Sequence, residues 1–183
     1  DEAIHLRSFS SYNIVMGNTV RDTGLKVAFF GEGIYVGSAH HNWCKYSGCK
    51  PDASNYNVLE DNNIADTTAE NIDIKEGTTG GTISGNIFSG TGMAPSAATA
   101  WVNVKGNDWE ILDNTGTDSI GDGFQVHQVY PGWGVGNAFR GNREAVGGPG
   151  YGIYVQSIRL NTVVSCGNVV TGGARLSNIS CSR

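Results

Sequence analysis

The sequence predicts an all-β protein, a right-handed parallel β-helix of about six coils with an asparagine ladder. Three observations support this prediction. The 183 residues include 27 glycines and only 39% are hydrophobic, a composition that favours short strands and turns over long helices. A short alternating segment recurs six times, and each time a second segment that ends in asparagine follows it. No long amphipathic segment indicates a helix.

The first segment of each repeat alternates apolar and polar residues, so its apolar side chains share one face of a strand. The expected inward-facing pairs are Ile4 with Leu6, Ile34 with Val36, Ile72 with Ile74, Val102 with Val104, Phe124 with Val126, and Ile153 with Val155. Successive segments are 22 to 38 residues apart. Such spacing suits one supersecondary unit per coil, with connecting loops of varying length.

The second segment ends in an asparagine at the same place in each repeat. These residues are Asn18, Asn62, Asn86, Asn114, Asn142 and Asn168. Asparagine can adopt left-handed backbone geometry at a turn, and its side chain can bond the backbone of a neighbouring coil. The recurrence in register favours an internal ladder. The alternative is an antiparallel β-sandwich with ordinary turns.

The length predicts a single domain over residues 1–183. The first residues already form a complete strand segment, and the end of a β-helix needs a cap over its open edges. We therefore expect the chain to be the C-terminal part of a longer β-helix, with a missing N-terminal β-helix segment as its partner. The net charge of -5 argues against a general nucleic-acid binder, and no apolar run reaches membrane-spanning length. We expect neither nucleic acid nor membrane as a partner.

The four cysteines fall into two local pairs, Cys44 with Cys49 and Cys166 with Cys181. An even count, with one pair in a polar loop and the other near the C-terminus, predicts two disulfides and an oxidising compartment. We therefore expect a secreted, extracellular protein. The alternative is four free thiols in a cytosolic protein.

Stacking places the outward residues of successive segments in columns. One column carries Lys75, Lys105 and His127, each one coil from the next. Like charges about 5 Å apart repel, which tends to lower the pKa of one lysine, and such a lysine can act as a general base. The predicted catalytic residues are Lys75 as the base and Lys105 or His127 as its partner.

The neighbouring columns supply side chains that suit binding of sugars and metal. The expected substrate-binding residues are Arg7, His5, Tyr35, Asn103, Gln125 and Tyr154. The carboxylates of Glu70, Asp73 and Glu32 lie nearby, and such hard oxygen ligands suit Ca²⁺, or they simply neutralise the lysines. The alternative for all of these residues is a solvated surface whose ion pairs contribute little.

The segments GEGIYVGSAHHNW, TAENIDIKEGTTGGTISGNIF and DGFQVHQVYPGWGVGNAFRGN resemble secreted, pectate-lyase-like β-helix repeat proteins of bacteria and fungi. The strands around Lys75 and Lys105 are also similar to the chondroitinase B and alginate lyase family. That resemblance implies Lys75 as the base that removes the proton next to a uronate carboxylate. It also implies Lys105 as the acid and a calcium ion held by Glu70 and Asp73. The family differs in having arginine at the position of Lys105 and Lys-Ser where this chain has Lys75-Glu76.

The columns and the resemblance together predict an extracellular polysaccharide lyase that cleaves an acidic, uronic-acid glycan by β-elimination. The expected partner is the acidic polysaccharide, and Ca²⁺ is the expected cofactor. A glycoside hydrolase on the same scaffold, using Asp73, Glu70 and Asp122, is the second hypothesis. A non-catalytic glycan-binding or structural β-helix is the third.

Overall fold

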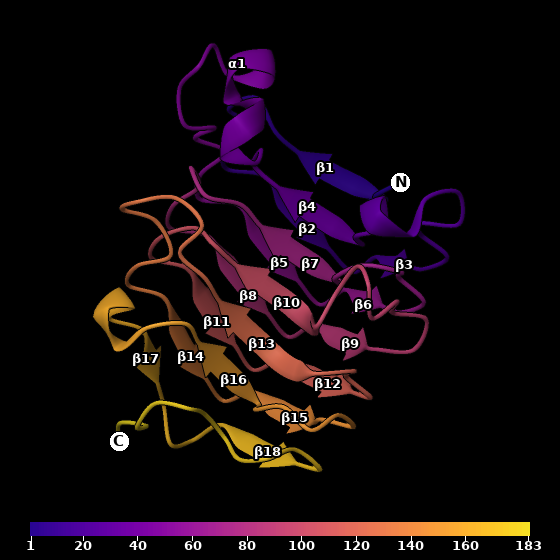
Figure 1. Cartoon of the computed structure of the whole chain (residues 1–183), viewed down its shortest axis with the longest axis vertical. Helices are drawn as coiled ribbons and strands as arrows, with labels where there is room; N and C mark the ends of the chain where they lie inside the picture. The colour runs from indigo at the N-terminus through magenta and orange to yellow at the C-terminus, as the bar shows by residue number, and fades with distance from the viewer.

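A computed structural model describes residues 1–183 and shows a parallel β-helix of six coils, which confirms the predicted fold class. Each coil gives one strand to each of three six-stranded parallel sheets, and the coils stack in sequence order from N- to C-terminus (Figure 1). The first sheet contains β1 (Ile4–Leu6), β4 (Ile34–Val36), β7 (Ile72–Ile74), β10 (Ala100–Val104), β13 (Asp122–Val126) and β16 (Ile153–Val155). The second contains β2 (Ile14–Met16), β5 (Val58–Glu60), β8 (Thr82–Ser84), β11 (Glu110–Leu112), β14 (Ala138–Arg140) and β17 (Val163–Val164). The third contains β3 (Thr19–Val20), β6 (Asn63–Ile64), β9 (Ile87–Ser89), β12 (Thr115–Thr117), β15 (Arg143–Ala145) and β18 (Val169–Thr171).

The first sheet has the register that the alternating segments predict. Asp73 pairs with Tyr35 on one side and with Asn103 on the other. Lys75 and Lys105 follow the ends of β7 and β10, and their backbone N–H groups donate to carbonyls one coil back, so they keep the same register. The outward side chains of successive coils therefore stand in columns, as expected.

The asparagine ladder is also confirmed. Asn86 donates to Oδ1 of Asn114 through its backbone N–H at 2.9 Å and through its Nδ2 at 3.0 Å. Asn114 donates to Asn142 in the same two ways, and its Nδ2 also donates to the carbonyl of Ile83 at 2.9 Å. Because every inner rung bonds both the next asparagine and a backbone carbonyl, these buried amides find the partners that burial demands.

A third strand per coil is a feature that the sequence did not reveal. This strand comes directly after the ladder asparagine. Only one of its side chains faces the core, so the sequence shows no alternation of apolar and polar residues there. The inward residues are Val20, Ile64, Phe88, Gly116, Glu144 and Val170. Gly116 is required there because a Cβ would lie 2.5 Å from the ring of Trp101. Glu144 is a buried acid in an otherwise apolar column.

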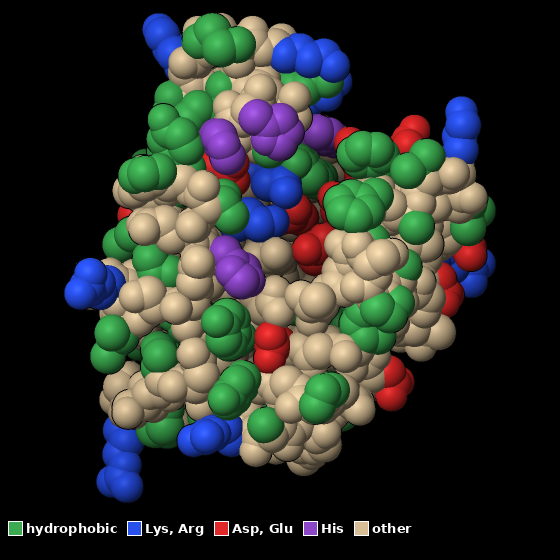
Figure 2. All heavy atoms as spheres, in the orientation of Figure 1, with side chains coloured by type: hydrophobic (Ala, Val, Ile, Leu, Met, Phe, Trp, Pro, Cys, Tyr) green, Lys and Arg blue, Asp and Glu red, His purple; other side chains and the backbone are tan.

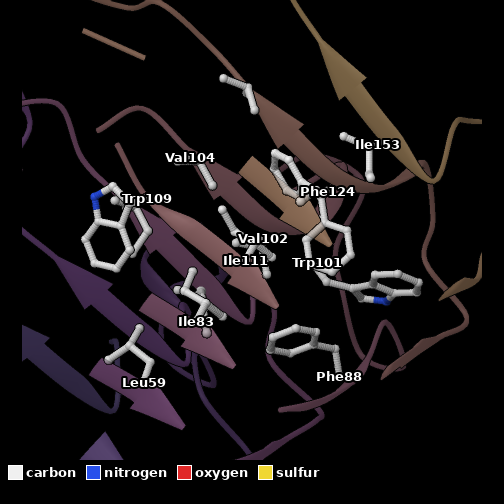
Figure 3. Close-up of a cluster of buried hydrophobic side chains, with 14 of the residues drawn as sticks. Leu59, Ile83, Phe88, Trp101, Val102, Val104, Trp109, Ile111, Phe124 and Ile153 are labelled. Carbon is white, nitrogen blue, oxygen red and sulfur yellow. The ribbon is translucent and has the colours of Figure 1, made fainter. Parts of the chain in front are cut away.

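The core fills the interior of the coils with aliphatic and aromatic side chains (Figure 3). Phe124 packs edge-on against Phe88 and Trp101, with ring centroids 6.1 and 5.9 Å away. The indole N–H of Trp101 donates to the carbonyl of Thr117 at 2.9 Å, so this fully buried ring leaves no polar atom unpaired.

The remaining elements lie in the loops that connect the sheets. They are η1 (Ala28–Phe30), η2 (His40–Asn42), α1 (Trp43–Tyr46) and η3 (Ile158–Leu160). Both predicted disulfides, Cys44–Cys49 and Cys166–Cys181, are present. None of the helices has the length and apolar character that crossing a membrane requires.

Candidate active site

A groove lies over the outer face of the first sheet, where that face crosses the first four coils. Its cavity volume is about 610 Å³. The floor carries Glu32, Tyr35, Glu70, Asp73, Lys75 and Lys105. Basic, acidic and histidine side chains gather in the hollow of this face (Figure 2). The groove is the place where the columns predicted from the sequence meet.

Asp73 binds both lysines at the floor of the groove. Its Oδ2 lies 2.5 Å from Nζ of Lys75, and its Oδ1 lies 2.6 Å from Nζ of Lys105. Asp73 is 1% exposed and Lys105 is 8% exposed. The outward face is therefore not a solvated surface at this cluster, and these ion pairs belong to the buried class in which removal of one partner is costly.

The two lysines differ in pKa, and the lysine with the lowered pKa is not the one that we expected. Burial is the largest single effect and disfavours the charged form of Lys75, but the charge of Asp73 and the other groups around Nζ together outweigh it and raise the pKa of Lys75. Burial lowers the pKa of Lys105, and the charge of Lys75 lowers it further despite Asp73. The repulsion expected between stacked lysines thus lowers the pKa of Lys105, the more deeply buried of the two.

Tyr35 lies beside Lys75 in the preceding coil. Nζ of Lys75 is 4.8 Å from the centroid of the Tyr35 ring. Burial raises the pKa of Tyr35, and the charge of Asp73 adds to this effect, so the phenol keeps its proton at neutral pH. A protonated phenol next to a lysine places a candidate general acid beside a candidate general base.

The expected calcium ligands lie together, because Glu32, Glu70 and Asp73 each bring an oxygen within 4.8 Å of the others. Burial and the charge of Asp73 raise the pKa of Glu32 to about 7, and the same two causes raise the pKa of Glu70. Both oxygens of Asp73 already bind ammonium groups, however. Ca²⁺ takes about six to eight oxygen ligands, so a calcium ion bound by the two remaining carboxylates would need water, amide or backbone oxygens as well.

Three expected site residues lie on the fifth and sixth coils and do not line the groove. Nε2 of His127 is 3.1 Å from Oε1 of Gln125, and the His127 ring centroid is 5.9 Å from that of Tyr154. Burial, followed by the charge of Lys105, lowers the pKa of His127. Asn103 is also absent from the lining and instead donates to Oε1 of Glu70 at 3.3 Å.

Arg7 and His5 line the groove as expected, at the end formed by the first coil. Nδ1 of His5 is 2.8 Å from Oε1 of Glu2, and its Nε2 is 2.9 Å from the carbonyl of Gly37. These bonds fix the imidazole against the groove floor. Arg7 is exposed at the same end.

The walls of the groove come from loops, and the aromatic residues that line them were not among the predicted site residues. Phe29 and Phe30 of η1 line the cavity, and so does Tyr46 of α1. The ring of Trp43 packs 5.1 Å from that of Tyr130, which anchors the wall that carries α1. Strand periodicity says nothing about loop side chains. The adjacent residues Phe29 and Phe30, followed by Gly31, were the feature of the sequence that could have indicated this wall.

No family model matches the chain, and no curated protein matches it. Among solved structures, it is similar to the alginate lyase from Paenibacillus sp. str. FPU-7, with a TM-score of 0.88 and 34% sequence identity. The match covers 100% of this chain and 62% of that one, so the chain spans less than two thirds of that structure. This similarity agrees with the expected likeness to alginate lyases. Membership of the wider pectate-lyase-like group stays a prediction.

Proposed function

We propose that this β-helix carries the active site of a polysaccharide lyase that cleaves an acidic, uronate-containing glycan by β-elimination. The observation that carries the proposal is the buried bridge from Lys75 through Asp73 to Lys105, with Tyr35 beside it in a groove. Similarity to an alginate lyase supports it and makes alginate the first substrate to test. The two disulfides support an extracellular location.

The bridge supplies a neutral amine for proton abstraction. Two ammonium groups around one carboxylate carry an excess positive charge, so the pair titrates as a unit and loses one proton below the usual lysine pKa. In the free protein Lys105 is the member that gives up its proton more readily, because its pKa is lowered whereas that of Lys75 is raised. A uronate carboxylate bound next to Lys105 favours its charged form, so the proton that the pair gives up then comes from Lys75. Lys75 becomes the neutral base.

The elimination then requires three groups. The Lys105 ammonium neutralises the uronate carboxylate, which acidifies the proton on the adjacent C5. The Lys75 amine removes that proton, the electron pair forms the C4–C5 double bond, and the C4–O4 bond breaks. The Tyr35 hydroxyl gives its proton to the departing oxygen, and the Lys75 ammonium beside it can restore that proton. Tyr35 thereby takes the acid role that we expected of Lys105 or His127.

Calcium has no step in this mechanism, because both Asp73 oxygens bind lysines. Neutralisation of the substrate carboxylate is assigned to Lys105 instead. Calcium bound elsewhere along the glycan path stays a prediction from the sequence, and removal of divalent ions tests it.

A glycoside hydrolase is the second candidate, and one observation favours it. The pKa of Glu32 is raised to about 7 by burial and Asp73, whereas the lysines lower that of Asp73 against the effect of burial. Two carboxyl groups with separated pKa values are typical of an acid and base pair in hydrolases. Asp122 does not join them, because its carboxylate accepts from Nε2 of Gln125 and from the N–H of Tyr151.

The test is the formation of an unsaturated, ultraviolet-absorbing product from polyuronates. Lys75→Ala and Lys75→Arg should each lower this rate by about 10²- to 10⁴-fold, because neither residue is a base at neutral pH. Lys26→Ala, at an exposed lysine outside the groove, is the matched control and should leave the rate unchanged. If the Lys75→Arg variant kept its activity, Lys75 would not be the base.

A further inference from the structure

Arg7 is a cation without an acidic partner at the first-coil end of the groove. No carboxylate forms a salt bridge with its guanidinium. The group lies over the ring of Tyr46, 4.1 Å from the centroid, and Nζ of Lys45 lies 4.7 Å from the same centroid. An exposed guanidinium that is held in place by a ring and carries no counter-charge is suited to bind an anion from solution.

One buried carboxylate fixes the position of Arg7 relative to Tyr46. Asp52 accepts from the backbone N–H groups of Ser8 and Phe9, each at 2.9 Å, and from Oγ of Ser38 at 2.7 Å. Ser8 and Phe9 directly follow Arg7, whereas Ser38 and Asp52 flank the loop that carries Tyr46. The Cys44–Cys49 disulfide closes the middle of that loop. Arg7 and Tyr46 are therefore held by the same anchor.

The register places Arg7 two coils from Lys75. The N–H of Gly37 donates to the carbonyl of Leu6, and the N–H of Lys75 donates to that of Val36, so Arg7, Gly37 and Lys75 occupy one column. Two coil steps amount to about 10 Å. The middle position has no side chain, because Gly37 has a φ of +86° and a Cβ there would lie 2.6 Å from Cγ2 of Thr78. Gly37 itself is buried, so no side chain of this column stands between the two cations.

We propose that Arg7 and Tyr46 form a distal subsite that binds the carboxylate of the uronate two units away from the one that reacts at Lys75. A linked uronate unit extends about as far as one coil step, so the middle unit lies over the second coil, where Tyr35 and Ala39 line the groove. Arg7 binds the carboxylate, and Tyr46 is a positioning residue that orients the guanidinium. This inference rests on the proposed function for the reacting unit, but binding at Arg7 does not require turnover.

The subsite predicts that activity depends on the length of the oligosaccharide. The measurement is kcat/KM on size-defined oligouronates of increasing length, expressed as the ratio between the longest and the shortest cleaved substrate. Arg7→Gln should reduce this ratio by about 10- to 100-fold, the loss expected for a hydrogen bond to a charged group. Lys50→Gln, at an exposed lysine of the same loop outside the groove, is the matched control and should keep the wild-type ratio.

Tyr46 is tested through its ring. Tyr46→Ala should reduce the ratio, and Tyr46→Phe should restore most of it, because the phenylalanine ring still packs against Arg7. The double variant Arg7→Gln/Tyr46→Ala should lose no more than Arg7→Gln alone, since Tyr46 acts through Arg7. If the loss of the length ratio in the double variant equals the sum of the losses in the two single variants, Tyr46 does not act through Arg7.

Retardation of each variant in gels that contain polyuronate separates the two proposals. An unchanged length ratio in Arg7→Gln, or an equal loss on all lengths, would overturn the subsite while lyase activity stands. Weaker retardation of Arg7→Gln than of a non-cleaving wild type would uphold the subsite and overturn the lyase. A wild type that neither cleaves nor is retarded would overturn both.

Discussion

Replacing Asp73 with asparagine removes the charge that holds the two lysines together. The side chain keeps its shape, but two buried ammonium groups lose their carboxylate. Removing one partner of a buried ion pair costs about 3–5 kcal/mol of folding free energy. Glu110→Gln is the matched control, because the Glu110–Arg140 pair is about half exposed, with side-chain exposures of 47% and 49%. Such a surface pair contributes about 0–1 kcal/mol.

The assay is urea denaturation of Asp73→Asn, Glu110→Gln and the wild type between pH 7 and pH 10. In Asp73→Asn both lysines have folded-state pKa values below their unfolded values, so the unfolded state binds more protons and stability rises with pH. We therefore expect a large deficit at pH 7 that narrows toward the unfolded lysine pKa of about 10.4. A deficit as small as that of Glu110→Gln, or one that does not change with pH, would refute the buried bridge.

Three further predictions concern the core, the ladder and metal. Burial raises the pKa of Glu144 to about 8, so the folded state keeps a proton that the unfolded state releases above about pH 4.3. Wild-type stability should therefore fall between about pH 4 and pH 8, and Glu144→Gln, measured by urea denaturation, should flatten this slope and be the more stable protein at pH 8. Asn114→Ala leaves the buried N–H donors of Asn86 and the buried carbonyl of Ile83 without a partner, so it should lower the free energy of unfolding by about 3 kcal/mol. Asn18 lies at the exposed end of the ladder, so Asn18→Ala should lower it by about 1 kcal/mol or less in the same assay. Equal costs at the two positions would contradict the ladder's role. Chelation of divalent ions should leave the initial rate of cleavage unchanged. A loss of activity that added calcium reverses would support the metal site.

Most of the fold could be predicted from the sequence, because each coil of the β-helix repeats the same pattern of residues. Alternation gave the register of the first sheet, and the recurring asparagine gave the ladder and its coils. The third sheet escaped notice because each of its strands buries one residue, and that residue is a glycine at Gly116 and an acid at Glu144.

The candidate site was only partly predictable, for a similar reason. The alternation of the strand segments alone places Asp73, Lys75 and Lys105 in neighbouring columns of the sheet. Column membership alone could not show that burial and the charge of Lys75 would lower the pKa of Lys105 rather than that of Lys75. Neither could it show that loop residues such as Tyr46 enclose only the first four coils, which leaves His127 outside the groove.

The masses of the products of a size-defined oligouronate test β-elimination most directly. We expect each cleavage to give two fragments whose masses sum to that of the substrate, one of them carrying a double bond, with no label taken up from heavy-oxygen water. Fragments that together exceed the substrate by one water molecule, with the heavy oxygen incorporated, would show hydrolysis and contradict the role of the Lys75–Asp73–Lys105 bridge.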